Sequence, residues 1–368
     1  MRVGADLDHL VAHARVLVCS GSGGVGKTTT AATLALRGAV QGRRAVVVTI
    51  DPARRLADTL GIGSLTNTPS RIEGSWPGEL WAMMLDTKST FDDLVVKHSA
   101  DEAQARRILG NRFYRNISGA LSGTQEYMAG EKLYELHEEA GFDLVVVDTP
   151  PARNALDFID ASRRLTNFLD HRLYRMLMTP TRAYLRAVNL AAQAFVRTVS
   201  KVVGGEVLDD ALAFFSAFEG MEEGFRARAD GVQALLGSDA TVFVLVASPR
   251  ADAVAEARFF AGRLAESNIT VAALIVNRVH PRFGPGRMEP LRELARRAEG
   301  TDLAALATNL ADLRALADGE DANLAELGSQ VAPASVSRVP LLDDDVHDLA
   351  GLERIAGHLF PRLTGSPV

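Results

Sequence analysis

A glycine-rich stretch near the amino end has the residue types and spacing of a phosphate-binding loop. Residues 21–28 read GSGGVGKT, which fits the pattern G-x-x-x-x-G-K-[ST]. The glycines let the backbone curl so that its N–H groups face phosphate oxygens. The side chain of Lys27 can reach the β- and γ-phosphates of a nucleoside triphosphate, and the hydroxyl of Thr28 can bind Mg²⁺. The residues predicted to contact the nucleotide are Gly21, Ser22, Gly23, Gly24, Val25, Gly26, Lys27, Thr28 and Thr29.

Two aspartates stand directly after apolar runs further along the chain. Asp51 follows residues 44–50 (RAVVVTI) and could orient the water that attacks the γ-phosphate, although it could instead cap a helix. Asp148 follows residues 144–147 (LVVV), which is the Walker B arrangement for holding Mg²⁺, although a plain acid at a strand end looks the same. The predicted catalytic residues are Lys27, Asp51 and Asp148. The predicted metal site is Thr28, Asp51 and Asp148.

Apolar runs and helix-like stretches alternate along the chain, which is typical of a parallel sheet with right-handed crossovers. The runs are continuous, as expected for strands that are covered on both faces. The predicted strands are 16–18, 44–50, 80–85, 144–147, 241–247, 271–276 and 336–341. In such sheets ligands bind at the carboxyl ends of the strands. The sequence therefore predicts an α/β fold of the P-loop NTPase class, a mostly parallel sheet with helices on both faces.

Helices are predicted between these strands and in one long insertion. The predicted helical ranges are 7–14, 27 to about 38–42, 54–60, 100–140, 251–267, 286–328 and 349–359, and Ser89-Thr90 is predicted to cap a further helix near Phe91. Residues 61–77 read as a loop, and residues 157–236 as an α-helical insertion subdomain. The predicted domains are 1–156 as the first part of the core, with a helical segment at about 89–140, then 157–236 as a helical interaction subdomain, and 237–368 as the second part of the core.

The composition is that of an ordinary globular protein. The chain has 368 residues, 47% apolar and 23% charged, and its net charge of −6 gives no general reason to expect nucleic-acid binding. Its single cysteine, Cys19, allows neither an internal disulfide nor a Cys-x-x-Cys metal site and suits a reducing cytoplasm. The sequence shows no secretion signal and no run of about 20 apolar residues, so we expect a cytoplasmic protein without membrane spans.

Five short motifs together resemble those of one ATPase family. In chain order they are GSGGVGKTTT, TIDPA, DTPPARNALDF, IVNR and VPLL. The set resembles the arsenite-pump and tail-anchored-protein-targeting (anion-transporting) ATPase family of deviant-Walker P-loop ATPases. The resemblance extends from about Val16 to Leu359, and the loop and the DTPP segment carry most of it.

The resemblance implies ATP and Mg²⁺ as cofactors and a role for each motif. Asp51 would lie in switch I and position the attacking water, and Asp148 would head a switch II that runs through Phe158. Asn277 and the Pro340-Leu341 loop would contact adenine, although asparagine at a strand end is also ordinary turn chemistry. Family members are dimers that close around two ATP molecules and move a helical subdomain that handles a client.

The chain departs from the family pattern directly after Gly21. The family's loop usually begins G-K-G-G, and its first lysine crosses the dimer interface to the partner's nucleotide, whereas here Ser22 stands in that place. Three explanations stay open: slow hydrolysis, a substitute charge from Arg153, or a related partner subunit that retains the lysine. Asn154 replaces a switch II histidine, and the family's zinc pair and arsenite-sensing cysteines are missing. We therefore expect neither a zinc-linked dimer nor activation by arsenite.

The predicted insertion carries an apolar and a basic set of side chains. The apolar set follows helical spacing and could line a groove for an apolar helix, but packing of these faces on each other is the favoured alternative. Its members are Leu165, Phe168, Leu169, Leu173, Met176, Leu177, Leu185, Val188, Ala192, Phe195 and Val196. The basic set would meet an anionic membrane peripherally or form a solvated face with neighbouring acids. Its members are Arg163, Arg164, Arg172, Arg175, Arg182 and Arg186.

The leading expectation is a cytoplasmic Mg²⁺-dependent ATPase that switches a dimer between open and closed states to drive a client-handling or targeting step. Its partner subunit would be a second copy or a related ATPase, with a client protein as a further partner. One alternative is a catalytically weak nucleotide-binding scaffold subunit paired with a lysine-retaining paralogue. Another is a partition-type ATPase that binds DNA, which the acidic charge balance disfavours.

Overall fold

The computed structural model describes residues 6–51, 55–117, 124–150, 161, 167 and 205–360. Contacts divide the chain into two compact units. The first unit comprises residues 1–84, 141–156 and 239–368, and the second comprises residues 85–140 and 157–238. The sequence-based boundaries counted residues 89–140 with the core, whereas the contacts group them with the insertion.

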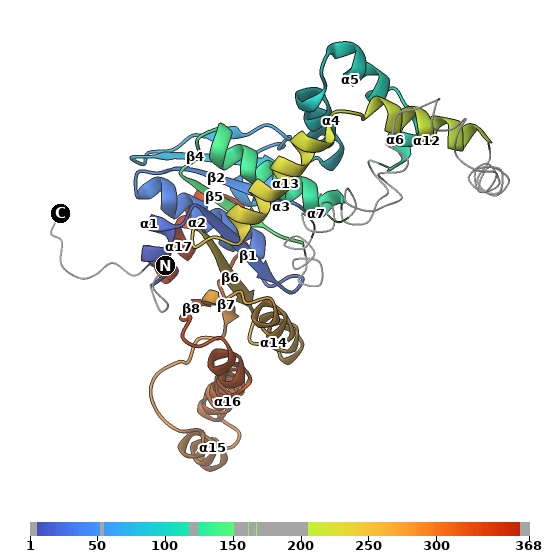
Figure 1. The fold of residues 1–368 in the computed structure, drawn as a ribbon. Coiled ribbons are helices and arrows are strands. Elements are labelled where there is room, and N and C mark those ends of the chain that lie inside the picture. Colours follow the sequence, from blue (N-terminus) through green and yellow to red (C-terminus); the bar gives the residue numbers. More distant parts are fainter. Residues whose placement is uncertain are drawn as a thin grey trace. The chain divides into compact units, whose positions relative to one another are not determined.

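One sheet organises the first unit (Figure 1). Its strands in the described residues are β1 (Val16–Gly21), β2 (Arg44–Thr49), β3 (Ser70–Ile72), β4 (Glu79–Met84), β5 (Leu144–Asp148), β6 (Thr241–Ala247), β7 (Val271–Val279) and β8 (Ser335–Pro340). The order across the sheet is β3-β4-β2-β5-β1-β6-β7-β8, and neighbouring strands are parallel except for β3 and β4. The predicted mostly parallel α/β fold is thereby confirmed. Strand β3 lies in the predicted loop 61–77, and the sequence does not mark it because two of its three residues are exposed.

The first unit also contains seven helices in the described residues, and some of them cover the two faces of this sheet. They are α1 (Leu7–His13), α2 (Lys27–Val40), α3 (Arg55–Leu60), α14 (Ala251–Glu266), α15 (Met288–Arg297), α16 (Asp302–Gln330) and α17 (Leu349–Leu359). The crossover from β1 to β2 through α2 and the crossover from β6 to β7 through α14 run in opposite directions across the sheet. Right-handed crossovers therefore place α2 and α14 on opposite faces.

Close packing of α2 on the central strands fixes where the phosphate loop ends. Leu34, Leu36 and Leu144 are buried, and a Cβ on Gly38 would come within 2.6 Å of the Leu144 side chain. A glycine at this position lets α2 approach β5 more closely than a larger residue would allow. The first residue of α2, Lys27, is thereby held next to the end of β1.

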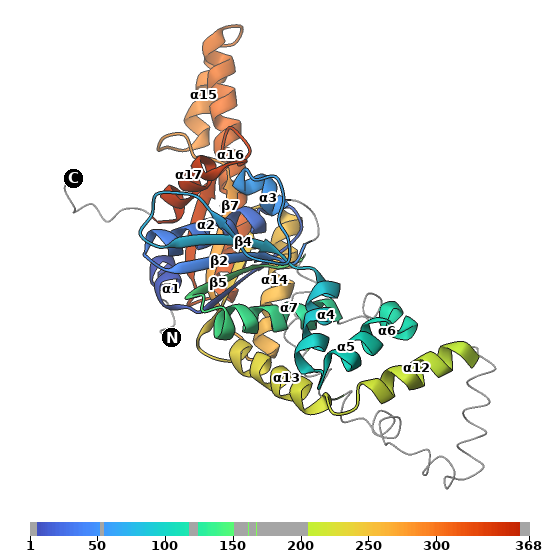
Figure 2. The ribbon, with the colours of Figure 1, turned by 90° about the horizontal axis from the view of Figure 1, so that it is seen from above.

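Helices α15 and α16 form a hairpin that leads away from the sheet between β7 and β8 (Figure 2). The sequence predicted one helical stretch over 286–328. In the structure the helix is interrupted near Gly300, whose φ is +84°, and α16 begins after Thr301, which is its N-cap. Arg314 of α16 is buried and donates hydrogen bonds to the carbonyl oxygens of Phe283, at 3.0 and 3.2 Å, and Pro285, at 3.0 Å. These bonds tie the loop before α15 to the hairpin.

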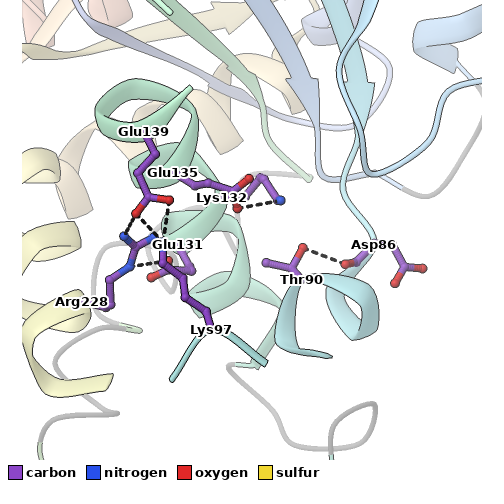
Figure 3. Close-up of polar contacts among 8 residues, drawn as sticks. All are labelled: Asp86, Thr90, Lys97, Glu131, Lys132, Glu135, Glu139 and Arg228. Carbon is purple, nitrogen blue, oxygen red and sulfur yellow. Dashed lines mark hydrogen bonds and ion pairs between the residues drawn. The ribbon is translucent and has the colours of Figure 1, made fainter. Parts of the chain in front are cut away.

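The second unit, where it is described, is helical. Its elements are α4 (Thr87–His98), α5 (Glu102–Leu109), α6 (Arg112–Ile117), α7 (Thr124–Tyr134) with a π-helical turn η1 (Glu135–Glu139), α12 (Gly205–Ala217) and α13 (Glu222–Leu236). The prediction that Ser89-Thr90 caps a helix near Phe91 is wrong. The Asp86 carboxylate accepts a hydrogen bond from the Ser89 N–H at 2.5 Å, so it is the N-cap and the helix begins at Thr87. Thr90 instead donates its hydroxyl to the Asp86 carbonyl (Figure 3).

An ion cluster, buried at Arg228 and Glu131 and exposed at Glu139 and Lys97, links α13 to α7 and η1 (Figure 3). The Arg228 guanidinium pairs with Glu131 and Glu139, and Glu139 also accepts from Lys97 at 2.6 Å. Arg228 additionally lies 4.6 Å from the centre of the Tyr134 ring. Glu131 is fully buried, and its Oε2 finds no hydrogen-bond partner among the described residues. The cluster therefore adds polar contacts to the apolar packing of α13 on α7.

Several predicted features fall outside the described residues. They are the apolar and arginine sets between residues 163 and 196 and the switch II residues Arg153, Asn154 and Phe158. Within the described ranges, no helix combines the length and the apolar character needed to cross a bilayer.

Candidate active site

The phosphate loop lies between the end of β1 at Gly21 and the start of α2 at Lys27, as the sequence predicts. Gly24 and Gly26 have φ angles of +77° and +93°, in the left-handed region that glycine occupies without strain. A Cβ on Gly21 would lie 2.1 Å from the carbonyl oxygen of Val246, and one on Gly26 would lie 2.2 Å from the side-chain nitrogen of Asn277. The fold therefore requires glycine at both ends of the loop.

Lys27 points into this loop. Its side chain is buried, and its Nζ donates a hydrogen bond to the carbonyl oxygen of Ser22 at 2.8 Å. Burial lowers the pKa of the ammonium, while the carboxylate of Asp148 acts in the opposite direction. A partly desolvated cation held beside the glycine-rich loop is suited to phosphate oxygens.

Asp148 and two threonines form a polar group beneath the loop. The Asp148 Oδ2 accepts hydrogen bonds from the hydroxyls of Thr28, at 2.7 Å, and Thr49, at 2.9 Å. The carboxyl is almost completely buried, and within the described residues its Oδ1 has no hydrogen-bond partner. Burial raises the pKa of Asp148, and the two hydroxyls and Lys27 oppose that shift. Strands β1, β2 and β5 bring these residues together because their carboxyl ends meet at one edge of the sheet.

These residues fit Mg²⁺. Magnesium prefers oxygen ligands and is commonly held by one or two carboxylates together with substrate phosphates. The unpartnered Oδ1 of Asp148 and the hydroxyl of Thr28 provide such oxygens. In the described residues, no group of three or more His, Cys, Asp or Glu side chains could hold a metal ion by itself. A metal at this place would take its remaining oxygen ligands from water and from the phosphates of a nucleotide.

Asp51 lies two residues after the end of β2. Its N–H donates to the hydroxyl of Thr49 at 3.3 Å, and its carboxylate forms an ion pair with Arg55 at 3.4 Å. The charge of Asp51 also acts on Lys27 and on Asp148, so it belongs to the same electrostatic group. Its predicted roles in orienting water and binding metal stay predictions.

Ser22 occupies the position of the family's signature lysine. Its side chain is buried, and its Oγ has no hydrogen-bond partner in the described part of the chain. A short buried hydroxyl cannot reach a neighbouring subunit. Arg153, the candidate for a substitute charge, lies outside the described residues.

Asn277 contacts the phosphate loop. The sequence predicted that it follows the strand 271–276, but in the structure it lies within β7. Strand β7 continues to Val279 because its pairing with β8 shifts register between Val276 and Val279. The Asn277 side-chain nitrogen donates to the carbonyl oxygen of Val25 at 3.0 Å. Its predicted contact with adenine stays a prediction.

The sequence analysis did not predict a role for the next residue, Arg278, although the IVNR motif contains it. The Arg278 Nη1 donates a hydrogen bond to the carbonyl oxygen of Gly24 at 3.1 Å.

Pro340 and Leu341 lie beside the end of β7. The Leu341 N–H donates to the carbonyl oxygen of Val279 at 2.8 Å. Pro340 lines a cavity of about 230 Å³ together with residues of β7, the segment that follows β7, α16 and β8. The lining residues are Val279, His280, Pro281, Arg282, Ala317, Asp321, Arg338 and Pro340. The predicted adenine contacts of Pro340 and Leu341 stay predictions.

Comparison with known proteins gives one family match and several distant relatives. The family described as anion-transporting ATPase matches residues 14–286. The "ATPase asna-1" of Caenorhabditis elegans is 28% identical over 145 residues, which is 37% of this chain and 42% of that protein. The "ATPase get3" of Aspergillus terreus is 27% identical over 146 residues, 39% of this chain and 42% of that protein. The "Putative arsenical pump-driving ATPase 2" of Aquifex aeolicus is 25% identical over 275 residues, 73% of this chain and 81% of that protein. The chain thus matches less than half the length of the two eukaryotic relatives.

Proposed function

Because the chain belongs to the anion-transporting ATPase family, as its motifs indicated, we propose that it is a Mg²⁺-dependent ATP hydrolase whose site is the loop Gly21–Thr28. The observation that carries this proposal is the polar group of Thr28, Thr49 and Asp148, which ends in a buried carboxylate oxygen without a partner among the described residues. Such an oxygen is costly to bury unless a cation neutralises it. The phosphate loop is directly adjacent, so a nucleotide-bound cation accounts for it.

The proposed mechanism assigns one task to each side chain. Lys27 leaves the Ser22 carbonyl and binds oxygens of the β- and γ-phosphates. Thr28 and Asp148 would hold Mg²⁺, which would neutralise charge on the transferred phosphoryl group. Asp51 gives up its ion pair with Arg55 and orients the attacking water. The backbone N–H groups of the loop stabilise the negative charge that spreads over the γ-phosphate oxygens.

We also propose that ATP drives a dimer between open and closed states in the cytoplasm. The dimer partner is a second copy or a related ATPase, and closure moves the helical unit that handles a client or targeting step. Similarity to proteins named as get3, asna-1 and arsenical pump-driving ATPases supports this proposal. Buried Ser22 makes the turnover of this chain slow when it acts alone.

Ser22 also favours a second candidate function, a nucleotide-binding scaffold subunit. Its side chain is buried and too short to supply charge across an interface. In that case the protein alone binds ATP without turnover above background, and addition of a lysine-retaining ATPase restores turnover. Ser22→Lys would restore turnover if Ser22 is the sole defect.

ATP hydrolysis by Lys27→Ala tests the proposal. We expect the variant to lose at least about 100-fold in turnover, because the cation is aimed at the charge that develops in the transition state. Lys88→Ala is the matched control, since Lys88 lies on α4 and pairs with Asp92 on the surface. Hydrolysis by Lys27→Ala at the wild-type rate would rule the site out.

A further inference from the structure

Arg278 has a backbone conformation that is unusual for its type. In the described part of the chain, the non-glycine residues with positive φ are Asn268, at +57°, and Arg278, at +62°. Asparagine occupies the left-handed region fairly often, but arginine does so at a cost, because its Cβ crowds the following carbonyl oxygen. Such outliers tend to gather at functional sites. Arg278 therefore needs an explanation that Asn268 does not.

The left-handed backbone lets two consecutive side chains reach the same loop. In a regular strand, neighbours such as Asn277 and Arg278 point to opposite faces of the sheet. Here the register shift and the positive φ turn both toward the phosphate loop. The Asn277 amide donates to the carbonyl of Val25 at 3.0 Å, and the Arg278 guanidinium donates to the carbonyl of Gly24 at 3.1 Å. The Arg278 N–H also donates to the Asn277 Oδ1 at 2.9 Å, which orients that amide.

These two bonds determine which way the loop's N–H groups face. In a trans peptide the N–H points opposite to the C=O of the same unit. Holding the carbonyls of Gly24 and Val25 toward β7 therefore turns the N–H groups of Val25 and Gly26 to the other side of the backbone, where the phosphates bind. Because residues 24 and 26 are glycines, the peptide groups between them can rotate easily. Hydrogen bonds from outside the loop are therefore needed to fix their orientation.

We propose that Arg278 is a positioning residue that orients the Val25 N–H of the phosphate loop for a nucleoside triphosphate. This inference rests on the proposed function, since it presumes that the loop binds Mg²⁺-ATP. The strained backbone of Arg278 is the structural cost of that orientation. Removing the side chain lowers nucleotide affinity while the fold is kept.

The test compares Arg278→Gly, Arg278→Ala and Arg278→Lys for Mg²⁺-ATP affinity by calorimetry and for thermal unfolding. We expect Arg278→Gly to bind about tenfold more weakly, as expected for one lost charge-assisted hydrogen bond, and to unfold at the same or a higher temperature because glycine suits this φ. Arg278→Ala should show the same loss, and Arg278→Lys should recover most of the affinity. Asn268→Gly is the matched control, with a comparable backbone and unchanged affinity.

Two results would overturn the inference. Wild-type affinity in both Arg278→Gly and Arg278→Ala would show that the contact does not orient the loop. A fall in the unfolding temperature of Arg278→Gly together with its affinity would show that the role is structural only. Failure of the wild-type protein and of Asn268→Gly to bind Mg²⁺-ATP is a different outcome, which would remove the proposed function itself and this inference with it.

Discussion

The proposed chemistry needs Asp148 as a charged carboxylate, whereas stability of the fold favours its neutral form. Its carboxyl is buried, and burial raises its pKa above the ordinary value. A carboxyl whose pKa is higher in the folded than in the unfolded state stabilises the fold at pH values below the unfolded pKa. It loses that contribution as the pH rises through the folded pKa. Ionisation of this carboxyl therefore lowers the stability of the folded protein.

We expect Asp148→Asn to raise the free energy of unfolding at pH 7 by about 1 kcal/mol, because the amide oxygen still accepts from Thr28 and Thr49 without a buried charge. ATP turnover should fall at least about 100-fold. Urea unfolding at pH 7 and at pH 4 measures the stability difference, which should shrink at pH 4 as the wild-type carboxyl takes up a proton. A variant that loses stability and activity together would contradict this account.

At the scale of elements, helix α13 is attached to α7 by buried apolar side chains and by the ion pair between Arg228 and Glu131. We expect Arg228→Ala to lower the free energy of unfolding by about 3–5 kcal/mol, because it leaves Glu131 charged and buried. Burial already raises the pKa of Glu131 despite its pairing with Arg228. Denaturant unfolding measures the loss, and adding Glu131→Gln to Arg228→Ala should recover part of it. Arg106→Ala, which removes an exposed ion pair with Glu102, is the control and should change stability by less than about 1 kcal/mol. A similar cost for both arginines would contradict the assignment.

The elements that the sequence predicted best are those with continuous apolar runs. Strand β6 and helix α17 have the predicted bounds, because a buried strand and an amphipathic helix each have a distinct periodicity. The short edge strand β3 lacks such a pattern, since it is mostly exposed. The start of α4 was misplaced because Asp86 competes with Ser89 and Thr90 as a cap, and only the folded geometry decides among them.

In the candidate site, too, the sequence predicted the residues with a clear pattern and missed those that depend on the folded geometry. That the loop and Asp148 meet was predictable, because the loop follows β1 and Asp148 ends β5, and the carboxyl ends of parallel strands form one ligand edge. The contact between Arg278 and Gly24 depends on a bulge and a left-handed φ that no residue pattern in β7 announces. The direction of the Asn277 amide likewise follows from that bulge.

At the scale of the whole molecule, the proposed switch requires two ATPase subunits. We expect Asp51→Asn to bind ATP without hydrolysing it, because water is no longer oriented, and to sediment with Mg²⁺-ATP at about twice the 39.5 kDa of one chain if the partner is a second copy. The ADP-bound protein is the control. A mass of one chain in every nucleotide state would contradict the homodimer and leave a related subunit as the partner.

Titration calorimetry of Mg²⁺-ATP into the purified protein measures whether the loop Gly21–Thr28 binds the nucleotide. We expect one ATP per chain, and an affinity at least about 100-fold weaker in Lys27→Ala, since the buried ammonium would be a principal positive charge for the phosphates. Equal affinity in the two proteins, or no ATP bound by the wild type, would contradict nucleotide binding at this loop.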